Sequence, residues 1–428
     1  MIEEFSFGNF WSFKDIQTLN MTAAKIKSKN SELDATNVFS INSDLSLIKT
    51  KAIYGANASG KSNVIKALSS FIRIIYYSVE RETILEIIDA FQLNSKSIIE
   101  PTFFQMIFRI GKIRYRYGFE CDKNSIKSEW LFSTPKKREQ VLFIRENNKV
   151  DTINHTHFEE GTLYQKLFEN SNDPIFTPTS LFLSHLSKTG FGKLSKQIVN
   201  TIASITIMPG LGHQGMVDNA INSLNEIDQK KFILHFLQKA DIGIEDLYVV
   251  EMANDQSIGE LDSNEVIDSK NRKVIVSRKK QFDSQDKLIG QSRFSFQHQE
   301  SEGTIKMFEL SPYIYSSIKN GTPLFIDEFD ARFHPLLTKK IVELYNSVGN
   351  KKSQLIFTTH DTNLLSSDLL RRDQIDFVEK DKYGASHLYT LVEIKGVRND
   401  ASFEKDYIQG KYGAIPFLGD FRNLLTFE

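Results

Sequence analysis

The fold of this chain is decided by the stretch Tyr54-Gly55-Ala56-Asn57-Ala58-Ser59-Gly60-Lys61-Ser62-Asn63. An apolar run, Ala52-Ile53-Tyr54, leads into it, and the residues that follow, 64–68, have the apolar spacing of a helix. A glycine-rich turn between a strand and a helix is the context that a P-loop requires. A chance match in a loop rich in Gly and Ser is the alternative, and both flanks argue against it.

The chemistry expected of this loop is the binding of ATP and Mg²⁺. Gly55 and Gly60 allow the backbone to turn tightly, and the unpaired N–H groups at the start of the next helix attract an anion. We expect residues 55–63 to surround the phosphates, Lys61 to bind the β- and γ-phosphates, and the Ser62 hydroxyl to bind Mg²⁺.

The composition is that of an ordinary globular protein. The 428 residues include 53 basic and 54 acidic side chains, 40% hydrophobic residues and a single cysteine, Cys121. The near-zero net charge argues against an overall positive field that would attract nucleic acid, although a local basic patch is not excluded. One cysteine excludes internal disulfides and cysteine-cluster zinc sites within this sequence, which fits a reducing cytoplasm. We expect no membrane span, because no apolar run is long enough.

The N-terminal half predicts an antiparallel β layer beside the P-loop. Residues 2–13 read as strands around a turn, and the alternating apolar residues of 102–120 predict a hairpin that bends at Gly111-Lys112. Three arginines decorate this layer, and a solvated strand face is favoured over a nucleic-acid patch. We expect the P-loop helix to continue through residues 71–93.

Residues 160–240 read as mostly helical, with an amphipathic helix over 227–240 and a strand over 244–250. The polar run 254–291 predicts a flexible hairpin or loop insertion. We find no sustained heptads, so long coiled-coil arms are not expected.

A second motif supplies carboxylates. Pro323-Leu324-Phe325-Ile326-Asp327-Glu328 is an apolar strand that ends in two acids. We expect this strand to lie beside the P-loop strand, with Asp327 near Mg²⁺ and Glu328 near an attacking water. Many strands end in acidic residues, so the pair is informative only together with the other motifs.

Two further segments complete the pattern. Ser301 and Gly303 precede a helix expected over 307–318 and resemble a degenerate ABC signature. In ABC ATPases the signature binds the γ-phosphate held by a second copy of the protein. A plain helix N-cap is the alternative. His360 ends an apolar strand about 30 residues after the carboxylates. This order and spacing favour a histidine that senses the γ-phosphate over a structural one.

The order of these motifs is that of the ABC ATPase superfamily. The segment Asn9-Phe10-Trp11-Ser12-Phe13 resembles the opening motif of SMC and RecF ATPases, with Trp11 in place of a basic residue. We interpret Trp11 as a packed core residue, with an adenine-facing aromatic as the alternative. No glutamine is assigned to the Q-loop; Gln92 is a poor candidate because it precedes the hairpin.

A finer resemblance covers residues 1–135 and 290–420. Glu300 to Thr304, Ile326 to Asp330, Thr358 to Asp361 and the tail Gly410 to Pro416 are similar to segments of RloA/AbiL-type bacterial ATPases, which are related to the ATPase half of OLD nucleases and to the PARIS ATPase. The resemblance implies an anti-phage defence protein whose ATP state controls a separately encoded effector, such as a Toprim-like nuclease. We expect no appended Toprim domain, because little sequence follows His360 here.

We therefore expect an α/β fold: a P-loop ABC-type ATPase core with an antiparallel β layer and a helical insertion. Residues 1–150 would form an N-terminal lobe, 151–250 the insertion and 251–428 a C-terminal lobe. Glu328, His360 and Lys61 would carry hydrolysis in a cytoplasmic homodimer or higher homo-oligomer. Nucleic acid is left open as a partner, directly or through the effector, and a membrane is not expected.

Other functions stay open at this stage. A RecF-like DNA-repair ATPase would show DNA-stimulated hydrolysis, a transporter subunit would copurify with a membrane protein, and a scaffold would bind ATP with little turnover. The neighbouring gene would discriminate between these functions, because a nuclease gene favours defence and a permease gene favours transport.

Overall fold

The structure is a computed structural model of residues 1–428, and it describes all of them except 169–176, 210–213, 241, 253–271, 399 and 417–428. The chain divides into two compact units that interleave along the sequence. Unit 1 comprises Met1–Met208, Gly321–Phe329 and Thr338–Glu428; unit 2 comprises Pro209–Asn320 and Asp330–Leu337.

A six-stranded sheet in unit 1 contains the P-loop strand. Its order is β11-β15-β16-β5-β17-β18, and every neighbouring pair is parallel except β17 and β18. The strands are β11 (Thr206–Met208), β15 (Leu324–Ile326), β16 (Leu355–Thr358), β5 (Thr50–Tyr54), β17 (Ile375–Lys380) and β18 (Ser386–Thr390). Because both faces of such a sheet are covered, all of β5, β15 and β16 is buried, and the buried Lys51 of β5 is paired with Asp376 of β17.

The position expected for the carboxylate strand was wrong. β15 does not pair with β5, because β16 lies between them and pairs with both. The apolar patterns of β15 and β16 are alike, so local sequence cannot say which of them is adjacent to the P-loop strand. Parallel strands still end at one edge, so Asp327 remains near the P-loop.

A seven-stranded antiparallel sheet forms a second layer of unit 1, in the order β10-β9-β8-β7-β6-β1-β2. The strands are β1 (Ile2–Gly8), β2 (Gln17–Asn20), β6 (Thr102–Ile110), β7 (Ile113–Cys121), β8 (Ile126–Thr134), β9 (Gln140–Glu146) and β10 (Lys149–Ile153). The hairpin expected over residues 102–120 is confirmed by β6 and β7. The α/β fold class, with a P-loop core and an antiparallel layer, is confirmed as well.

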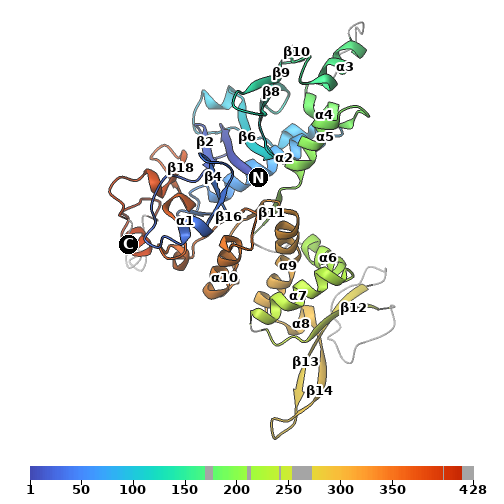
Figure 1. The fold of residues 1–428 in the computed structure, drawn as a ribbon, viewed down its shortest axis with the longest axis vertical. Helices are drawn as coiled ribbons and strands as arrows, with labels where there is room; N and C mark the ends of the chain where they lie inside the picture. Colours follow the sequence, from blue (N-terminus) through green and yellow to red (C-terminus); the bar gives the residue numbers. More distant parts are fainter. Residues whose placement is uncertain (169–176, 210–213, 241, 253–271, 399, 417–428) are drawn as a thin grey trace, which may run out of the picture. The chain divides into compact units, whose positions relative to one another are not determined.

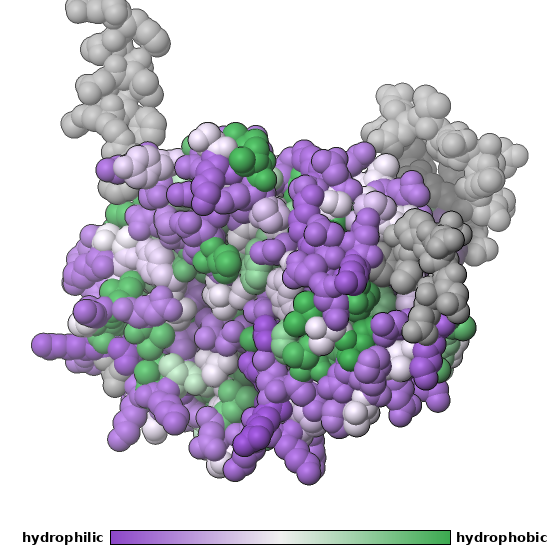
Figure 2. Space-filling model, turned by 90° about the horizontal axis from the view of Figure 1, so that it is seen from above, coloured by the Kyte–Doolittle hydropathy of each residue, from purple (hydrophilic) through white to green (hydrophobic). Residues whose placement is uncertain are grey.

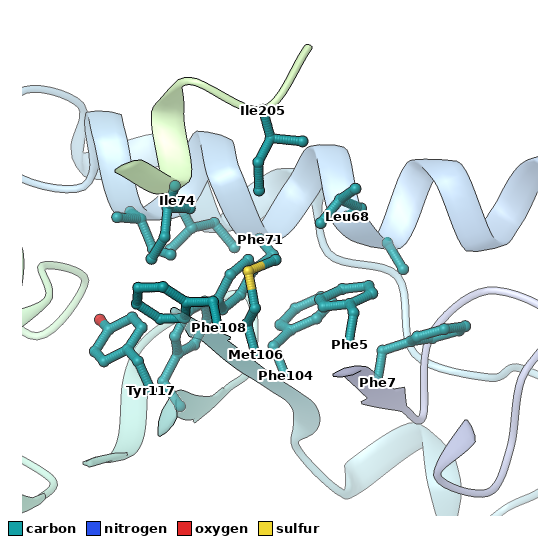
Figure 3. Close-up of a cluster of buried hydrophobic side chains, with 14 of the residues drawn as sticks. Phe5, Phe7, Leu68, Phe71, Ile74, Phe104, Met106, Phe108, Tyr117 and Ile205 are labelled. Carbon is teal, nitrogen blue, oxygen red and sulfur yellow. The ribbon is translucent and has the colours of Figure 1, made fainter. Parts of the chain in front are cut away.

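Helix α2 (Lys61–Tyr77) connects the P-loop to this second sheet. Leu68, Phe71 and Ile74 pack on aromatic side chains from β1 and β6, as Figure 3 shows. Phe71 stacks on Phe119 with ring centroids 5.6 Å apart and an interplanar angle of 7°. The core therefore holds the helix that starts at the phosphate loop firmly against the sheet.

The expectation that this helix continues to residue 93 was wrong. α2 ends at Tyr77, and a 3₁₀ segment, η1 (Glu82–Ile87), follows. Beyond the helix, Ile84, Leu85 and Ile88 are buried in the same core, whereas Leu93 is exposed. The remaining elements of unit 1 are α1 (Leu33–Thr36), β3 (Val38–Ser40), β4 (Ser46–Ile48), η2 (Ser97–Ile99), α3 (Glu159–Phe168), α4 (Phe182–Lys188), α5 (Lys193–Ala203), η3 (Thr362–Leu364), η4 (Arg372–Gln374), η5 (Leu391–Glu393) and α11 (Phe403–Ile408).

Unit 2 combines helices with a three-stranded antiparallel sheet, β12-β13-β14. Helices α6 and α7 pack against α9, and the amphipathic helix expected over 227–240 is confirmed by α7. The elements are α6 (Gln214–Ser223), α7 (Ile227–Lys239), β12 (Asp246–Met252), β13 (Arg272–Phe282), β14 (Leu288–Ser295), α8 (Phe296–Gln299) and α9 (Glu302–Asn320). Helix α10 (Pro335–Asn346) begins in unit 2 and continues in unit 1. The insertion expected over 254–291 is an ordered hairpin from Arg272 onwards; 253–271 lie outside the described residues.

The three arginines of the antiparallel layer are paired with nearby carboxylates. Arg109 and Arg114 both bind the Glu3 carboxylate, and Arg116 binds Glu139 with 2.6 Å between Nη2 and Oε2. On the face drawn in Figure 2, hydrophilic residues predominate and hydrophobic ones form separate patches. Within the part of the chain that the structure describes, no helix is both long and apolar enough to span a membrane.

A buried ion pair ties the antiparallel sheet to helix α4. Glu129 and Arg145 are fully buried and 3.3 Å apart. The Glu129 carboxylate also accepts the N–H groups of Phe182 and Leu183 and the hydroxyl of Tyr117. Burial raises the pKa of the Glu129 carboxyl, and Arg145 and the N–H donors oppose that rise.

Replacing Glu129 by Ala should therefore destabilise unit 1 strongly. The change leaves a buried guanidinium and two backbone N–H groups without their carboxylate, which costs about 3–5 kcal/mol. The matched control is Glu139→Ala, which removes a partly exposed pair and should cost less than about 1 kcal/mol. Urea denaturation followed by circular dichroism measures both; equal losses would contradict the assigned role of the buried pair.

Candidate functional site

The P-loop follows β5 and is closed by tight backbone contacts. Gly60 has φ 116°, and a Cβ there would lie 2.6 Å from the Ser386 hydroxyl and 2.7 Å from the Ser12 hydroxyl. At Gly55 a Cβ would meet the carbonyl oxygen of Val378 at 2.4 Å. Only glycine fits at either position, so the loop is shaped by residues from both ends of the chain.

Lys61 lies buried at the start of α2, and its ammonium turns back over the loop. Its Nζ atom donates to the carbonyl oxygens of Gly55 at 2.9 Å and Ala56 at 3.0 Å. The Ser59 hydroxyl in the same loop is buried without a hydrogen-bond partner among the described residues. A loop that holds a cation and an unpaired hydroxyl suits an anionic ligand with several oxygen atoms.

A three-residue cluster joins the P-loop helix to two strand ends. The Asp327 carboxylate, just after β15, accepts the hydroxyl of Ser62 at 3.1 Å and that of Thr358 at 2.5 Å. Ser62 is on α2, and Thr358 is the last residue of β16. Ser62 and Asp327 are predicted from the sequence to bind one metal ion, and the structure brings their side chains together. Their metal-binding role stays a prediction.

Thr358 was missed as a functional residue. Its hydroxyl donates to Asp327 and also accepts the backbone N–H of Glu328 at 2.8 Å. The signal was present in the sequence, because a threonine ends the strand two residues before His360. Local sequence did not reveal that this strand is the one between β5 and β15.

Glu328 has an unusual backbone. Its φ is 48°, in the left-handed region that non-glycine residues rarely adopt, and its side chain is exposed. Two bonds to Thr358 hold this conformation: the N–H of Glu328 donates to the hydroxyl, and the N–H of Phe329 donates to the carbonyl at 2.9 Å. Strain of this kind concentrates at functional sites.

His360 follows β16 at the same sheet edge and is exposed. The backbone on either side of His360 is bonded to the P-loop strand. The N–H of Thr359 donates to the carbonyl of Ile53 at 3.1 Å, and the Tyr54 hydroxyl donates to the carbonyl of Asp361 at 3.1 Å. The chain at His360 is therefore held next to the strand that carries the P-loop. Its function as a γ-phosphate sensor remains a prediction.

Ser301 and Gly303 belong to unit 2, whereas the P-loop belongs to unit 1. Helix α9 starts at Glu302, five residues earlier than expected, and the Ser301 hydroxyl accepts the N–H of Thr304 at 3.1 Å. The N-cap interpretation is confirmed by this bond. The signature-like role does not compete with it and stays a prediction.

The interpretation of Trp11 as a core residue was wrong. Trp11 is 42% exposed, has φ 49°, and lies under the ammonium of Lys66, 4.3 Å from the ring centroid. The loop is held by the Trp11 N–H, which donates to the carbonyl of Asp89 at 2.7 Å. The next residue, Ser12, accepts the Asn63 amide at 2.9 Å, so an exposed indole is attached directly to the P-loop helix.

The residues around Asp327 suit Mg²⁺ better than a transition metal. Hydroxyl and carboxylate oxygens are its preferred donors, and Mg²⁺ uses few protein ligands when a phosphate supplies the rest. Among the described residues, no group of three or more His, Cys, Asp or Glu side chains could hold a metal ion. The donor set therefore fits Mg²⁺ bound together with a nucleotide.

Comparison with known proteins supplies a family. A family model described as "AAA domain, putative AbiEii toxin, Type IV TA system" matches residues 52–366, which is well over half of the chain. Comparison with curated proteins finds no match.

Solved structures similar to this chain include SMC head domains. The head domain from Thermotoga maritima is 12% identical, covers 91% of this chain and 98% of its own, and has a TM-score of 0.41. The SMC head bound to the C-winged helix domain of ScpA is 13% identical, with 91% and 97% covered and a TM-score of 0.43. An SMC head with an extended coiled coil, bound to the C-terminal domain of ScpA derived from Pyrococcus furiosus, is 13% identical, with 96% and 98% covered and a TM-score of 0.39.

Thr358 gives the sharpest test of this geometry. Thr358→Val keeps the shape of the side chain but removes both hydroxyl bonds, so Asp327 and the Glu328 backbone lose their support. Supporting residues of this kind change metal affinity or activity by about 10- to 100-fold, and we expect ATP hydrolysis to fall by that factor. Thr358→Ser keeps the hydroxyl and should stay within about threefold of wild type. Phosphate release measures the rates; equal rates for the valine and serine variants would contradict the role.

Proposed function

This chain belongs to the family described as "AAA domain, putative AbiEii toxin, Type IV TA system", and from this premise we propose that it binds and hydrolyses ATP. The observation that carries the proposal is the bonding of Ser62, on the P-loop helix, to Asp327, at the end of a neighbouring strand. In P-loop NTPases a serine and a strand-end aspartate in this relation hold Mg²⁺.

The phosphates would be held by the P-loop. The backbone of residues 55–63 donates N–H groups, and the ammonium of Lys61 exchanges its two carbonyl partners for phosphate oxygens. That exchange strengthens the contact, because a hydrogen bond between two ions is stronger than one to a neutral carbonyl. Mg²⁺, bound by Ser62 and Asp327, would neutralise charge on the β- and γ-phosphates.

Hydrolysis would be carried by Glu328 and His360. The carboxylate of Glu328, on a backbone held by Thr358, would orient a water molecule and accept its proton. The imidazole of His360 would donate a hydrogen bond to the γ-phosphate as negative charge develops there. Lys61 would stabilise the same charge.

A homodimer would complete the site. We propose that Ser301 and Gly303 of one copy bind the γ-phosphate held by the P-loop of another, so that hydrolysis depends on association. The start of α9 supports this proposal, because Gly303 lies in the first turn of the helix, where backbone N–H groups attract an anion. The ATP-bound form would then be the associated form, in a dimer or a higher homo-oligomer.

In the cell, we propose a sensor or scaffold subunit of an anti-phage defence system in the cytoplasm. The family description refers to a toxin and a type IV TA system, which supports a role of this class. The finer resemblance to RloA/AbiL-type ATPases adds the expectation of a separately encoded effector, a Toprim-like nuclease being the first candidate. ATP-dependent association would be the signal that reaches the effector.

We further propose that Trp11 stacks on the adenine base. Lys66 covers one face of its indole, and the loop is bonded to the P-loop helix through Ser12 and Asn63. An exposed aromatic ring tied to a phosphate loop can hold a base by stacking.

Two substitutions separate binding from hydrolysis. Lys61→Ala should weaken ATP binding by roughly 10- to 100-fold, since it removes charge-assisted bonds worth about 1.5–3 kcal/mol. Glu328→Gln should bind ATP normally, hydrolyse it about 100-fold more slowly and accumulate as an ATP-bound dimer. Equilibrium binding and size-exclusion chromatography with ATP measure these outcomes. Wild-type turnover by Glu328→Gln would remove Glu328 from the catalytic role.

Tryptophan fluorescence tests the position of the base. ATP should quench the fluorescence of the wild type and of Trp130→Phe, a control that removes the other tryptophan. Trp11→Ala should bind ATP about tenfold more weakly, and Trp11→Phe should retain affinity because a ring remains. Quenching that persists in Trp11→Phe would place the base elsewhere.

A further inference from the structure

Part of the sheet in unit 2 is a two-stranded ribbon without a third strand. β12 pairs with β13 from Arg272 to Arg278, whereas β13 and β14 pair onward to Phe282 and Leu288. Beyond Arg278 neither strand has another neighbour among the described residues, and Figure 1 shows the two strands extending past β12. The outer hydrogen-bonding edge of each strand is therefore unpaired in this part of the hairpin, most of which is exposed.

The β13–β14 hairpin as a whole, Arg272–Ser295, carries excess positive charge, and much of it lies on the part that also pairs with β12. The 24 residues from Arg272 to Ser295 include seven basic side chains and two acidic ones, a net charge of +5, although the whole chain has a net charge of −1. The basic residues are Arg272, Lys273, Arg278, Lys279, Lys280, Lys287 and Arg293. The near-zero total therefore conceals a local basic surface of the kind that attracts phosphate.

Acidic neighbours compensate this charge only in part. Lys279 bonds to Glu300 at 2.8 Å, and Lys280 lies 3.4 Å from Glu245. For Lys287 and Arg293 the structure gives no ion pair within the described part of the chain. Lys287 is exposed on the turn before β14, and Arg293 is exposed near the end of β14, opposite Arg278.

Two arginines face each other across the ribbon. Arg278 and Arg293 are direct partners in the β13–β14 register, which places both side chains on one face. Like charges in this relation destabilise a strand pair. Asp246, on the other side of Arg278, is bonded to Lys230 at 2.8 Å, so its charge is shared. An anion bound on this face would relieve the repulsion.

The same face continues to an apolar tip. Lys280 and Gln291 are the next pair, and Phe282 and Leu288 close the ladder with 52% and 56% of their side chains exposed. The face therefore presents cations, an amide and then an apolar pair. Base edges, sugars and phosphates together offer partners for all three types of side chain.

We propose that the β13–β14 ribbon binds double-stranded DNA through this face. The major groove of B-form DNA, about 12 Å wide, admits a two-stranded β-ribbon, and arginine and glutamine are donors suited to base edges. The major groove of an RNA duplex is too deep and narrow for such an element. The ribbon therefore discriminates B-form DNA from RNA by shape, and it adds a DNA-contacting surface to the proposed ATPase without depending on hydrolysis.

Fluorescence anisotropy with a labelled DNA duplex and the full chain, without nucleotide, tests the proposal. The double variant Lys280→Ala/Arg293→Ala should bind the duplex about tenfold more weakly and lower the slope of log affinity against log salt by about 2. The matched control, Lys136→Ala/Arg138→Ala, removes one lysine and one arginine from an exposed turn of unit 1 and should bind as the wild type does. All variants should keep wild-type ATP turnover, which reports that they fold.

Other outcomes would overturn the proposal. These are a wild type that fails to bind the duplex at low salt, equal losses in the ribbon and control variants, and equal affinity for an RNA duplex of the same sequence. Tighter binding of the ribbon to an acidic peptide than to DNA would assign the surface to a protein partner instead. Lys61→Ala should still bind DNA, so a failure of ATP binding and a failure of DNA binding are distinguishable.

Discussion

The site depends on one carboxylate that accepts two hydroxyls from different parts of the chain. Asp327 bonds to Ser62 on the P-loop helix and to Thr358 at the end of the central strand. These residues lie 265 and 31 positions from Asp327 in the sequence, and only a parallel sheet whose strands end at one edge brings them together. Because Thr358 also holds the strained backbone of Glu328, one hydroxyl supports both carboxylates.

The phosphate loop has a second support in the aromatic core. Helix α2 is packed on the antiparallel sheet through Leu68, Phe71 and Ile74, while Ser12 and Ser386 leave no room for a side chain at Gly60. Apolar packing therefore fixes the helical end of the loop. The close approach of the Ser12 and Ser386 side chains fixes its turn at Gly60. A loop fixed in this way loses little conformational freedom when it binds a ligand, which favours binding.

Charge is distributed unevenly between the parts of the molecule. In unit 1 the arginines of the antiparallel layer are neutralised by Glu3 and Glu139, and a buried pair joins Glu129 to Arg145. In unit 2 seven basic residues gather on the β13–β14 hairpin, and among the described residues the structure gives carboxylate partners for Lys279 and Lys280. Cations that pair with nearby carboxylates have a structural role, whereas cations without such a partner are available to a ligand. Counts of basic and acidic residues alone do not show this difference.

The sequence by itself determined the P-loop, the hairpin of residues 102–120, helix α7 and the acidic strand end, because each is a local pattern of turn residues and apolar spacing. Only the tertiary structure decided that β16 lies between β5 and β15, and hence that Thr358 belongs to the site. It also decided that Trp11 is exposed, since the loop around it takes a left-handed backbone at two residues, Asn9 and Trp11. Strand order and loop exposure depend on contacts between residues far apart in the sequence. The sequence pattern of a strand does not reveal them, because the pattern is the same whichever strand lies beside it.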